Sequence, residues 1–356
     1  MKKIAVLGAT GYTGELVVKQ AAAQGLALII GGRDQGRLEE LNAECNGLHE
    51  VRTADVGDPQ SIDALIADAA VLIDTAGPFI DLGPPVIQRC IESGVHFLDT
   101  TGEQRYMLEV FQRFFDEATQ RKVSVIPSMA FEYSLGDCAA ALAAQRLPDV
   151  DEIDMFYYVP GFSTSRGTKL SALKVFGGET FCFLDGELTP QVPGAAEQRV
   201  AFLDQEGLHS ALSFPGGEPV LLPRHIALRD VRNWMVMKPK AARLFQPADE
   251  SSGRTPMLAM IERSLKSNKR GPTLSERQAA RFKVLVRGTS PSGTVACQVW
   301  GSDVYLLTAQ IILYGAKRLL AEDLPRGALT PSQAFGAGRM LDDLRPYGVQ
   351  TVCEGP

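Results

Sequence analysis

Three glycines, Gly8, Gly11 and Gly14, recur at intervals of three in the segment GATGYTG, directly after the apolar run Ile4–Leu7. Glycines at the first two positions would let a tight turn approach a pyrophosphate, and the third would let the next helix pack closely. A helix beginning at Tyr12 would direct its amide groups toward the phosphates. The pattern predicts a dinucleotide-binding loop, although the usual motif places its first two glycines two residues apart. A purely structural turn is the alternative.

The end of the second expected strand, IIGGRDQGR, indicates which nicotinamide cofactor the loop would hold. Sites that prefer NAD place an acidic residue about 20 residues beyond the glycines, where it binds the ribose 2′-hydroxyl. Arg33 stands at about that place. A guanidinium matches the 2′-phosphate of NADP in charge, and Arg37 would assist it. NADP(H) is therefore the predicted cofactor. Asp34 leaves NAD open, unless it caps the next helix and Arg33 is only an exposed side chain.

Two later segments fit the same crevice. Asp55 ends the third expected strand, where its carboxylate would accept from the adenine amino group or, alternatively, cap a helix. The segment DTAGPF, Asp74–Phe79, ends the fourth expected strand with small residues and a rigid Gly-Pro turn. Its backbone would approach the nicotinamide ribose, with Phe79 near the ring. A plain strand-ending turn is the alternative.

The segments that must position these residues alternate between apolar strands and amphipathic helices over about the first 130 residues. The expected strands are Lys3–Gly8, Leu26–Gly31, Glu50–Ala54, Ala70–Thr75, His96–Thr100 and Ser124–Ser128. The expected helices are Tyr12–Gln24, Gln35–Ala43, Asp58–Ala67, Pro84–Ser93 and Gln104–Gln120. This alternation predicts an α/β fold with an N-terminal Rossmann doubly wound parallel sheet, whose strand C-termini form the ligand-binding edge.

Beyond residue 130 the pattern changes, and it predicts a second mixed α/β domain with antiparallel strands. Arg281–Gly288 and Thr294–Trp300 would form an antiparallel hairpin with a longer turn. In the tail, Thr330 is the expected N-cap of a helix with Pro331 at its first position, and Gln333 would complete a capping box.

Composition excludes several classes of protein. The formal net charge of −6 and the pI of about 5.4 disfavour non-specific binding to nucleic acid. No H-E-x-x-H segment or C-x-x-C pair occurs, so no metal site is predicted, and the six dispersed cysteines are expected to be reduced thiols. The N-terminal apolar run is too short for a signal peptide, so a cytoplasmic protein is expected.

The most apolar stretch, Val304–Leu320, contains Gln310, Lys317 and Arg318. A spanning helix needs about 20 apolar residues, so a buried or interface helix is expected here and membrane association is not. Apolar helices in the second domain make a homodimer plausible. A membrane- or lipid-associated scaffold that uses this stretch is an alternative reading.

The chain resembles the saccharopine dehydrogenase-like oxidoreductases, which include trans-acting enoyl reductases. The resemblance rests on GATGYTG, GGRD…RLEEL, DTAGPF and, most specifically, CIESGVHFLDTTGE, Cys90–Glu103. Family members carry a segment like Gly-Phe-Asp-Ser-x-Pro-Ser-Asp after the sixth strand. Here Ala130–Asp137 reads AFEYSLGD, without the proline and with the acid lengthened to Glu132, which puts any substrate of the family in doubt.

The resemblance implies an NADP-binding Rossmann domain at residues 1–130 and a substrate or dimerisation domain at 131–325. A terminal helix, within 326–356, would return to the first domain. Carried onto this chain, the cofactor-binding residues are Gly8, Thr10, Gly11, Tyr12, Thr13, Gly14, Arg33, Asp34, Arg37, Asp55, Val56, Thr75, Ala76, Gly77, Pro78, Phe79, Thr100 and Gly102.

Hydride transfer is the chemistry of the nicotinamide, and the protein would supply orientation and a proton donor. No Tyr-x-x-x-Lys pair follows the fifth expected strand, and Cys138 in an apolar run is expected in the core. The candidate catalytic residues are Tyr133 just past a strand, Lys169 at a helix start and His225 beside Arg224. The alternatives are a packed tyrosine, a solvated lysine and a surface histidine.

These features together predict an NADPH-dependent oxidoreductase that reduces a C=C, C=N or C=O bond of a small-molecule or acyl substrate. The alternative is a protein that binds NADP(H) as a sensor without turnover, because no recognisable acid–base pair is present.

Overall fold

The computed structural model describes residues 3–245, 255–267 and 269–355, and the chain divides into two compact units. The first unit comprises Met1–Thr101, Tyr106–Phe131 and Tyr305–Phe335. The second comprises Gly102–Arg105, Glu132–Val304 and Gly336–Pro356. The ranges expected from the sequence, 1–130, 131–325 and 326–356, differ from this division at residues 102–105, 131, 305–325 and 336–356. The chain thus passes between the units several times.

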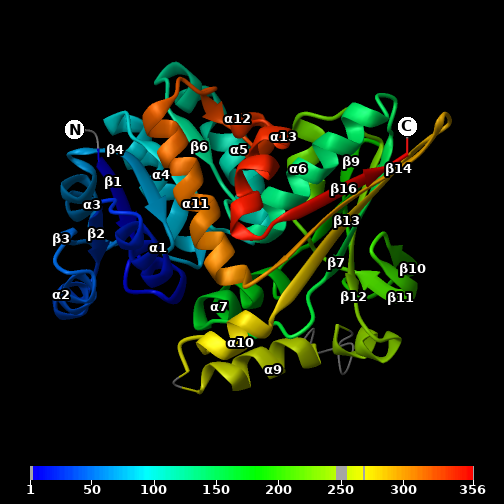
Figure 1. The fold of residues 1–356 in the computed structure, drawn as a ribbon, viewed down its shortest axis with the longest axis horizontal. Helices are drawn as coiled ribbons and strands as arrows, with labels where there is room; N and C mark the ends of the chain where they lie inside the picture. The colour runs from blue at the N-terminus through cyan, green and yellow to red at the C-terminus, as the bar shows by residue number, and fades with distance from the viewer. Residues whose placement is uncertain (1–2, 246–254, 268, 356) are drawn as a thin grey trace. The chain divides into compact units, whose positions relative to one another are not determined.

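The first unit is built on a seven-stranded parallel sheet with the order β15-β6-β5-β4-β1-β2-β3. Figure 1 labels β1, β2, β3, β4 and β6 of this sheet. Its strands are β1 (Lys3–Leu7), β2 (Ile29–Gly32), β3 (Glu50–Thr53), β4 (Ala69–Asp74), β5 (His96–Asp99), β6 (Ser124–Ile126) and β15 (Gly327–Ala328). The strand order reverses between β1 and β4, which is the point where doubly wound sheets bind ligands. The predicted Rossmann sheet is therefore confirmed, and β15 extends it by one strand.

Helices accompany the strands of this sheet. They are α1 (Tyr12–Ala23), α2 (Gln35–Glu44), α3 (Pro59–Ile66), α4 (Phe79–Ser93), α5 (Gln104–Gln120), α11 (Val304–Ala321) and α12 (Pro331–Phe335). The prediction that the fourth helix starts at Pro84 was wrong, since α4 begins at Phe79 with Pro84 and Pro85 inside it. The Phe79 ring packs 5.9 Å from the Tyr106 ring and is buried, so tertiary packing outweighs the local cost of the prolines.

The C-terminal part of the first unit confirms two predictions. Oγ1 of Thr330 accepts from the amide of Gln333 at 3.3 Å, and the Gln333 side chain accepts from the amide of Thr330 at 3.0 Å. These two bonds form the expected capping box of α12. Helix α11 is long and apolar enough to cross a membrane, but 72% of its residues are buried in the structure, as expected for a core helix.

The second unit is built on a nine-stranded mixed sheet. Its main order is β10-β11-β12-β7-β13-β14-β16, and β8 pairs with β12 and β9. The strands are β7 (Glu152–Tyr158), β8 (Phe181–Leu184), β9 (Glu187–Pro190), β10 (Glu197–Phe202), β11 (Gln205–Ser213), β12 (Asp230–Val236), β13 (Arg281–Ser290), β14 (Gly293–Ser302) and β16 (Gln350–Glu354). Only β12 and β7 pair in parallel, so the predicted antiparallel component is confirmed.

Short helices complete the second unit. They are α6 (Phe131–Arg146, which begins at the last residue of the first unit's segment), α7 (Arg166–Phe176), α8 (Glu218–Leu221), α9 (Pro256–Leu265), α10 (Leu274–Ala279) and α13 (Ala337–Leu344), with 3₁₀ turns at Leu222–Arg224, Pro239–Leu244 and Arg345–Tyr347.

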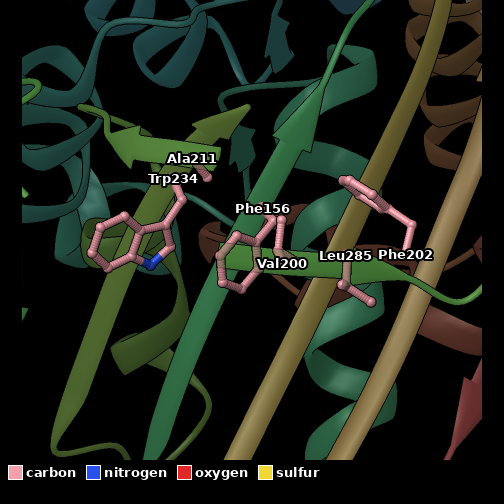
Figure 2. Packing of buried hydrophobic residues seen from close by; sticks show 6 residues of the cluster. All are labelled: Phe156, Val200, Phe202, Ala211, Trp234 and Leu285. Atoms are coloured by element: carbon pink, nitrogen blue, oxygen red, sulfur yellow. The ribbon is translucent and has the colours of Figure 1, made fainter. Parts of the chain in front are cut away.

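A hydrophobic cluster holds β10 and β11 against the central strands of this sheet. It contains Phe156, Val200, Phe202, Ala211, Trp234 and Leu285. These residues come from β7, β10, β11, β12 and β13, and Figure 2 shows their side chains from close by. The rings of Phe156 and Trp234 stack with centroids 6.3 Å apart. Aromatic burial of this kind stabilises a sheet whose strands come from distant parts of the chain.

Two expectations about the second unit were wrong. The hairpin pairs Ser290 with Gly293, so its turn has two residues, Pro291 and Ser292, and both strands are longer than expected. The cysteines are not all free, because Cys297 and Cys353 form a disulfide. Antiparallel pairing of β14 with β16 places these two residues opposite each other, which their separation in the sequence does not reveal. The other four cysteines are free and buried.

Candidate functional site

The glycine loop between β1 and α1 turns so tightly that it leaves no space for side chains at the turn. Gly8 has a φ of +76°, and the amide of Gly11 donates to its carbonyl at 2.8 Å. A Cβ at Gly14 would overlap the Gly8 carbonyl oxygen and lie 2.8 Å from Oγ1 of Thr75. Close packing of α1 against the loop therefore depends on glycine, as a cofactor cradle requires.

The N-terminus of α1 is open to an acceptor. Gly11 is its N-cap and provides no side-chain hydrogen bond to the first turn, which contains Tyr12 and Thr13. Amide groups at such a helix end attract phosphate oxygens through their hydrogens and through the helix dipole. The loop thus has the two features that binding of a pyrophosphate requires, which are a turn without side chains and the N-terminus of a helix.

A hollow of about 600 Å³ adjoins this loop. It is lined by Thr10, Arg33, Asp34, Gln35, Gly36 and Arg37. Nη2 of Arg37 donates to the Thr10 carbonyl at 2.7 Å, which fixes this guanidinium beside the loop. Within residues 3–245, 255–267 and 269–355, no group forms a hydrogen bond or an ion pair with the exposed side chain of Arg33. The hollow therefore offers an uncommitted cation to an anionic ligand.

Asp34 has a structural role at the rim of this hollow. Its Oδ1 accepts from the amide of Arg37 at 3.1 Å and caps α2. This is the capping role that the sequence left open, and a contact of Arg33 with the ribose stays a prediction. The donor set fits a 2′-phosphate better than a 2′-hydroxyl, because two guanidinium groups line the hollow.

Asp55 and Val56 follow β3. Oδ1 of Asp55 accepts from the amide of Gly57 at 2.9 Å, and the Asp55 amide donates to Oγ of Ser61 at 2.9 Å. The carboxylate thus shapes the turn that leads into α3, while Asp58 caps that helix by accepting from the amide of Gln60. A contact of Asp55 with adenine stays a prediction.

The segment after β4 is fixed by short-range hydrogen bonds. Oγ1 of Thr75 donates to the Leu7 carbonyl at 2.9 Å, and the amide of Ala76 donates to Oδ1 of Asp74 at 2.8 Å. The Gly77–Pro78 peptide is cis, and α4 begins at the next residue. Burial raises the pKa of Asp74 well above its ordinary value. Thr75 therefore joins this turn to the glycine loop, as a shared cofactor site needs.

The turn after β5 is organised by Asp99. Its carboxylate accepts from the amides of Thr101 (2.9 Å) and Ser128 (3.0 Å) and from the hydroxyl of Tyr106 (2.8 Å). Asp99 is fully buried, so these bonds satisfy it where water is absent. Thr100 is held between residues that this carboxylate fixes. The Asp99 carboxylate therefore fixes the turn that follows the fifth strand.

In the second unit, two of the three predicted catalytic residues lie beside polar residues of α6. Tyr133 is buried in the first turn of α6, and its ring lies 6.4 Å from that of Tyr157. Burial raises the pKa of Tyr133 well above its ordinary value. One turn further on, Oδ1 of the buried Asp137 lies 2.6 Å from Nε2 of His225, within hydrogen-bond distance. Asp137 is therefore positioned to orient the imidazole of His225, and Tyr133 is closed off from solvent.

Glu218, which the sequence reading missed, is the buried centre of the same region. It is 0% exposed and accepts hydrogen bonds from the hydroxyl of Tyr157 and from Nδ2 of Asn233. A Cβ at Gly136 of α6 would lie 2.6 Å from its Oε1, so the glycine makes room for it. Burial raises the pKa of Glu218 to about 7.

Glu132 is a second acid with a raised pKa, and the sequence reading missed this property. Its side chain is partly exposed, and Oε1 would lie 3.7 Å from a Cβ at Gly102. In the described part of the chain, no other side chain forms a hydrogen bond or an ion pair with it. Loss of water around the carboxylate raises the pKa of Glu132 to about 7. The departure AFEYSLGD in the family motif was the signal that could have drawn attention to it.

Lys169 and Cys138 differ from these acids in their surroundings. Lys169 is partly exposed in the first turn of α7, and no hydrogen bond or ion pair in the described ranges joins it to Tyr133 or His225. Cys138 is buried against Met340, and burial raises the pKa of its thiol. The expectation that Cys138 belongs to the core is confirmed. Among the described residues, no group of three or more His, Cys, Asp or Glu side chains could hold a metal.

Comparison with known proteins agrees with this geometry. Residues 4–126 match the model of the saccharopine dehydrogenase NADP-binding domain. A saccharopine dehydrogenase-like oxidoreductase of Rattus norvegicus is 22% identical over 98% of this chain and 96% of its own length. A protein of Mycobacterium tuberculosis whose name assigns it as a trans-acting enoyl reductase is 27% identical over 48% of this chain and 43% of its own. Yeast saccharopine dehydrogenase (L-Glu forming) has the same fold, with a TM-score of 0.65, 12% identity and full coverage of both chains.

The glycine cradle and the cationic hollow on a doubly wound sheet define an NADP-dependent oxidoreductase of the α/β class. Residues 4–126 thus match the saccharopine dehydrogenase NADP-binding domain, and over 98% of its length the chain is similar to saccharopine dehydrogenase-like oxidoreductases, in agreement with the resemblance carried by its sequence motifs.

Proposed function

We propose that this chain uses NADPH to reduce a C=C, C=N or C=O bond in a small-molecule or acyl substrate. The observation that carries the proposal is the Arg33 side chain in the hollow beside the glycine loop, which has no hydrogen-bond or ion-pair partner among the residues that the structure describes. A reductase draws on the phosphorylated cofactor, and an uncommitted guanidinium at the ribose position selects it. Bound NADPH supplies a hydride to the substrate.

The first unit contributes binding and orientation to this proposal. Gly8 and Gly14 would admit the pyrophosphate to the backbone, the amides of the first turn of α1 would hold it, and Arg33 with Arg37 would hold the 2′-phosphate. Thr75 to Phe79 and the Thr100–Gly102 turn stay proposed neighbours of the nicotinamide end. Phe79 has its ring packed against Tyr106, so its backbone is the part offered to a ligand.

The proposal is tested first by binding and then by turnover. NADPH is expected to raise the melting temperature of the protein more than NADH at equal concentration. Oxidation of NADPH is then followed in the presence of enoyl thioesters, cyclic imines and 2-oxo acids. Equal stabilisation by the two cofactors would contradict the role of Arg33. Binding without oxidation of NADPH by any substrate class would support the sensing alternative instead.

A further inference from the structure

Helix α11 lies outside residues 4–126, which match the NADP-binding domain, yet it contacts the helix that follows the glycine loop. The ring of Tyr305 packs edge-on against the ring of Tyr12, in the first turn of α1, with centroids 4.9 Å apart. Near the other ends of the two helices, Nζ of Lys317 donates to Oε1 of Gln24 at 2.8 Å. Both helices belong to the first unit, and the two contacts show that they run in the same direction.

Helix α11 is itself packed closely within the first unit. A Cβ at Gly315 would lie 2.7 Å from Cε of Met129 and 3.4 Å from Cδ1 of Leu98 on β5, so there is little space between the helix and its neighbours. The side chain of Tyr305 is buried, whereas that of Tyr12 is partly exposed. Tyr305 therefore offers a fixed surface on which the Tyr12 ring rests.

The first turn of α1 is the part of the cofactor site that this ring contact can orient. Its amide groups and the helix dipole stabilise a pyrophosphate only when they point toward it. The N-cap, Gly11, gives the turn no side-chain hydrogen bond, and Gly14 follows within it. Because glycines restrain the backbone weakly, a contact from another helix can fix the direction of this turn.

We propose that Tyr305 is a positioning residue for NADP(H), which acts through Tyr12 to hold the first turn of α1 toward the pyrophosphate. This inference deepens the cofactor-binding part of the proposed function and rests on it. NADPH and NADH share the pyrophosphate, and only NADPH has the 2′-phosphate. Loss of the Tyr305 ring should therefore weaken the binding of both cofactors by the same factor.

The test compares Tyr305→Leu and Tyr305→Phe with Tyr314→Leu. Tyr314 is a matched control, because it is a buried tyrosine of the same helix whose ring packs against Phe335 instead, at 5.8 Å. Tyr305→Leu should raise the Kd for NADPH and for NADH by about 3- to 10-fold, as loss of one aromatic contact implies. Tyr305→Phe keeps the ring and should restore wild-type affinity. Tyr314→Leu should lower the melting temperature but leave both constants unchanged.

A double-mutant cycle tests whether Tyr305 acts through Tyr12. If it does, the double variant Tyr12→Leu/Tyr305→Leu should bind NADPH no more weakly than Tyr12→Leu alone, because the second substitution has nothing left to remove. Isothermal titration measures the four values of Kd. Effects that multiply in the double variant would overturn the proposal.

A second readout needs no cofactor. Hydrogen exchange of the backbone amides in peptides that cover Gly8–Leu16 should be faster in Tyr305→Leu than in the wild type, because the first turn of α1 opens more often. Tyr305→Phe and Tyr314→Leu should exchange like the wild type in these peptides. Equal exchange in the wild type and Tyr305→Leu would contradict the positioning role.

The outcomes for Tyr305 and for the proposed function are distinct. If the wild type binds neither NADPH nor NADH, the cofactor-binding part of the proposed function fails and the role of Tyr305 fails with it. If the wild type binds and Tyr305→Leu binds equally well, or weakens NADPH alone, only the role of Tyr305 is overturned. If Tyr305→Leu does not fold, Tyr305→Met, which keeps most of the side-chain volume but not the ring, decides by the same comparison.

Discussion

The hollow beside the glycine loop and the acidic region around α6 place their charged groups in opposite surroundings. Arg33 is exposed and has no partner in the described ranges, while Glu218 is fully buried and accepts two hydrogen bonds. An exposed guanidinium retains its charge at any physiological pH and therefore attracts anions. A buried carboxyl group, in contrast, exchanges a proton near neutral pH. The first arrangement suits the binding of a fixed anion, and the second suits proton chemistry.

The largest effect is expected where the first unit depends on the absence of a side chain. Gly14→Ala would overlap the Gly8 carbonyl and should lower the free energy of unfolding by about 3 kcal/mol, with loss of stabilisation by NADPH. Chemical denaturation with and without NADPH measures both effects.

Gly338→Ala is the matched control, because a Cβ there would meet only Leu142, at 3.9 Å, and the residue lies inside α13. This control should raise the free energy of unfolding by about 0.5–1 kcal/mol. A Gly14→Ala protein that still binds NADPH would contradict the cradle.

The buried acid of the second unit should make stability depend on pH. Its pKa is raised from 4.5 to about 7 in the folded protein, so the folded state binds the proton more tightly. The stability associated with Glu218 is therefore fully present below about pH 4.5 and is lost as the pH rises through 7. One pKa unit corresponds to about 1.4 kcal/mol, so the loss approaches about 3 kcal/mol.

Denaturation of the wild type and of Glu218→Gln between pH 5 and pH 8 isolates this contribution. The substitution should flatten the pH dependence, because the introduced amide does not titrate. Oδ1 of Asn233 has no hydrogen-bond partner in the described part of the chain, so a rotated Asn233 amide can accept from the new donor. The exposed Glu197→Gln is the control. Parallel curves for the wild type and Glu218→Gln would show that this carboxyl titrates normally.

A smaller effect, on the affinity for NADPH, is expected when Arg33 in the hollow is replaced. Arg33→Ala should raise the Kd for NADPH by about 10- to 100-fold and leave the Kd for NADH unchanged, since one charge-assisted contact contributes about 1.5–3 kcal/mol. Isothermal titration measures both constants. Arg121→Ala, an exposed arginine at the end of α5, is the control. If both cofactors weaken equally, Arg33 does not contact the 2′-phosphate.

The smallest effect concerns the segment that completes the first unit. Thr330→Ala removes the cap of α12 and should lower the free energy of unfolding by about 1 kcal/mol. Urea denaturation detects this change, and Gln333→Ala should have a weaker effect of the same sign, because it removes the other half of the capping box. No change in either variant would show that this cap contributes nothing.

The features that the sequence predicted are those that depend on residues close together in the chain. Gly8 to Gly14 and Arg33 lie within one strand-helix-strand unit, and Thr330 and Gln333 lie one helical turn apart. Within such short segments, the spacing of residues alone predicts the local structure. Their local geometry agrees with the predictions made from it, while contacts with a cofactor stay predictions.

The features that the sequence did not predict depend on contacts across the fold. Tyr157, Glu218 and Asn233 come from β7, α8 and β12, and both the pairing of the two strands and the packing of α8 bring them together. Cys297 and Cys353 are opposite each other because β16 joins the second sheet. The pKa of Glu132 is raised because the fold removes water from around its carboxyl group, and no residue spacing predicts this loss of water.

The discontinuity of the first unit has a consequence for synthesis on the ribosome. Its parallel sheet needs β15 and its core includes α11, yet roughly 200 residues separate Phe131 from Phe335. Translation at about 5–20 residues per second inserts a delay of about 10–40 s between those points. The glycine loop and the first strands are therefore synthesised well before β15, and the β6 edge stays unpaired until β15 has emerged. A chaperone that shields this edge during the delay would raise the yield of folded protein.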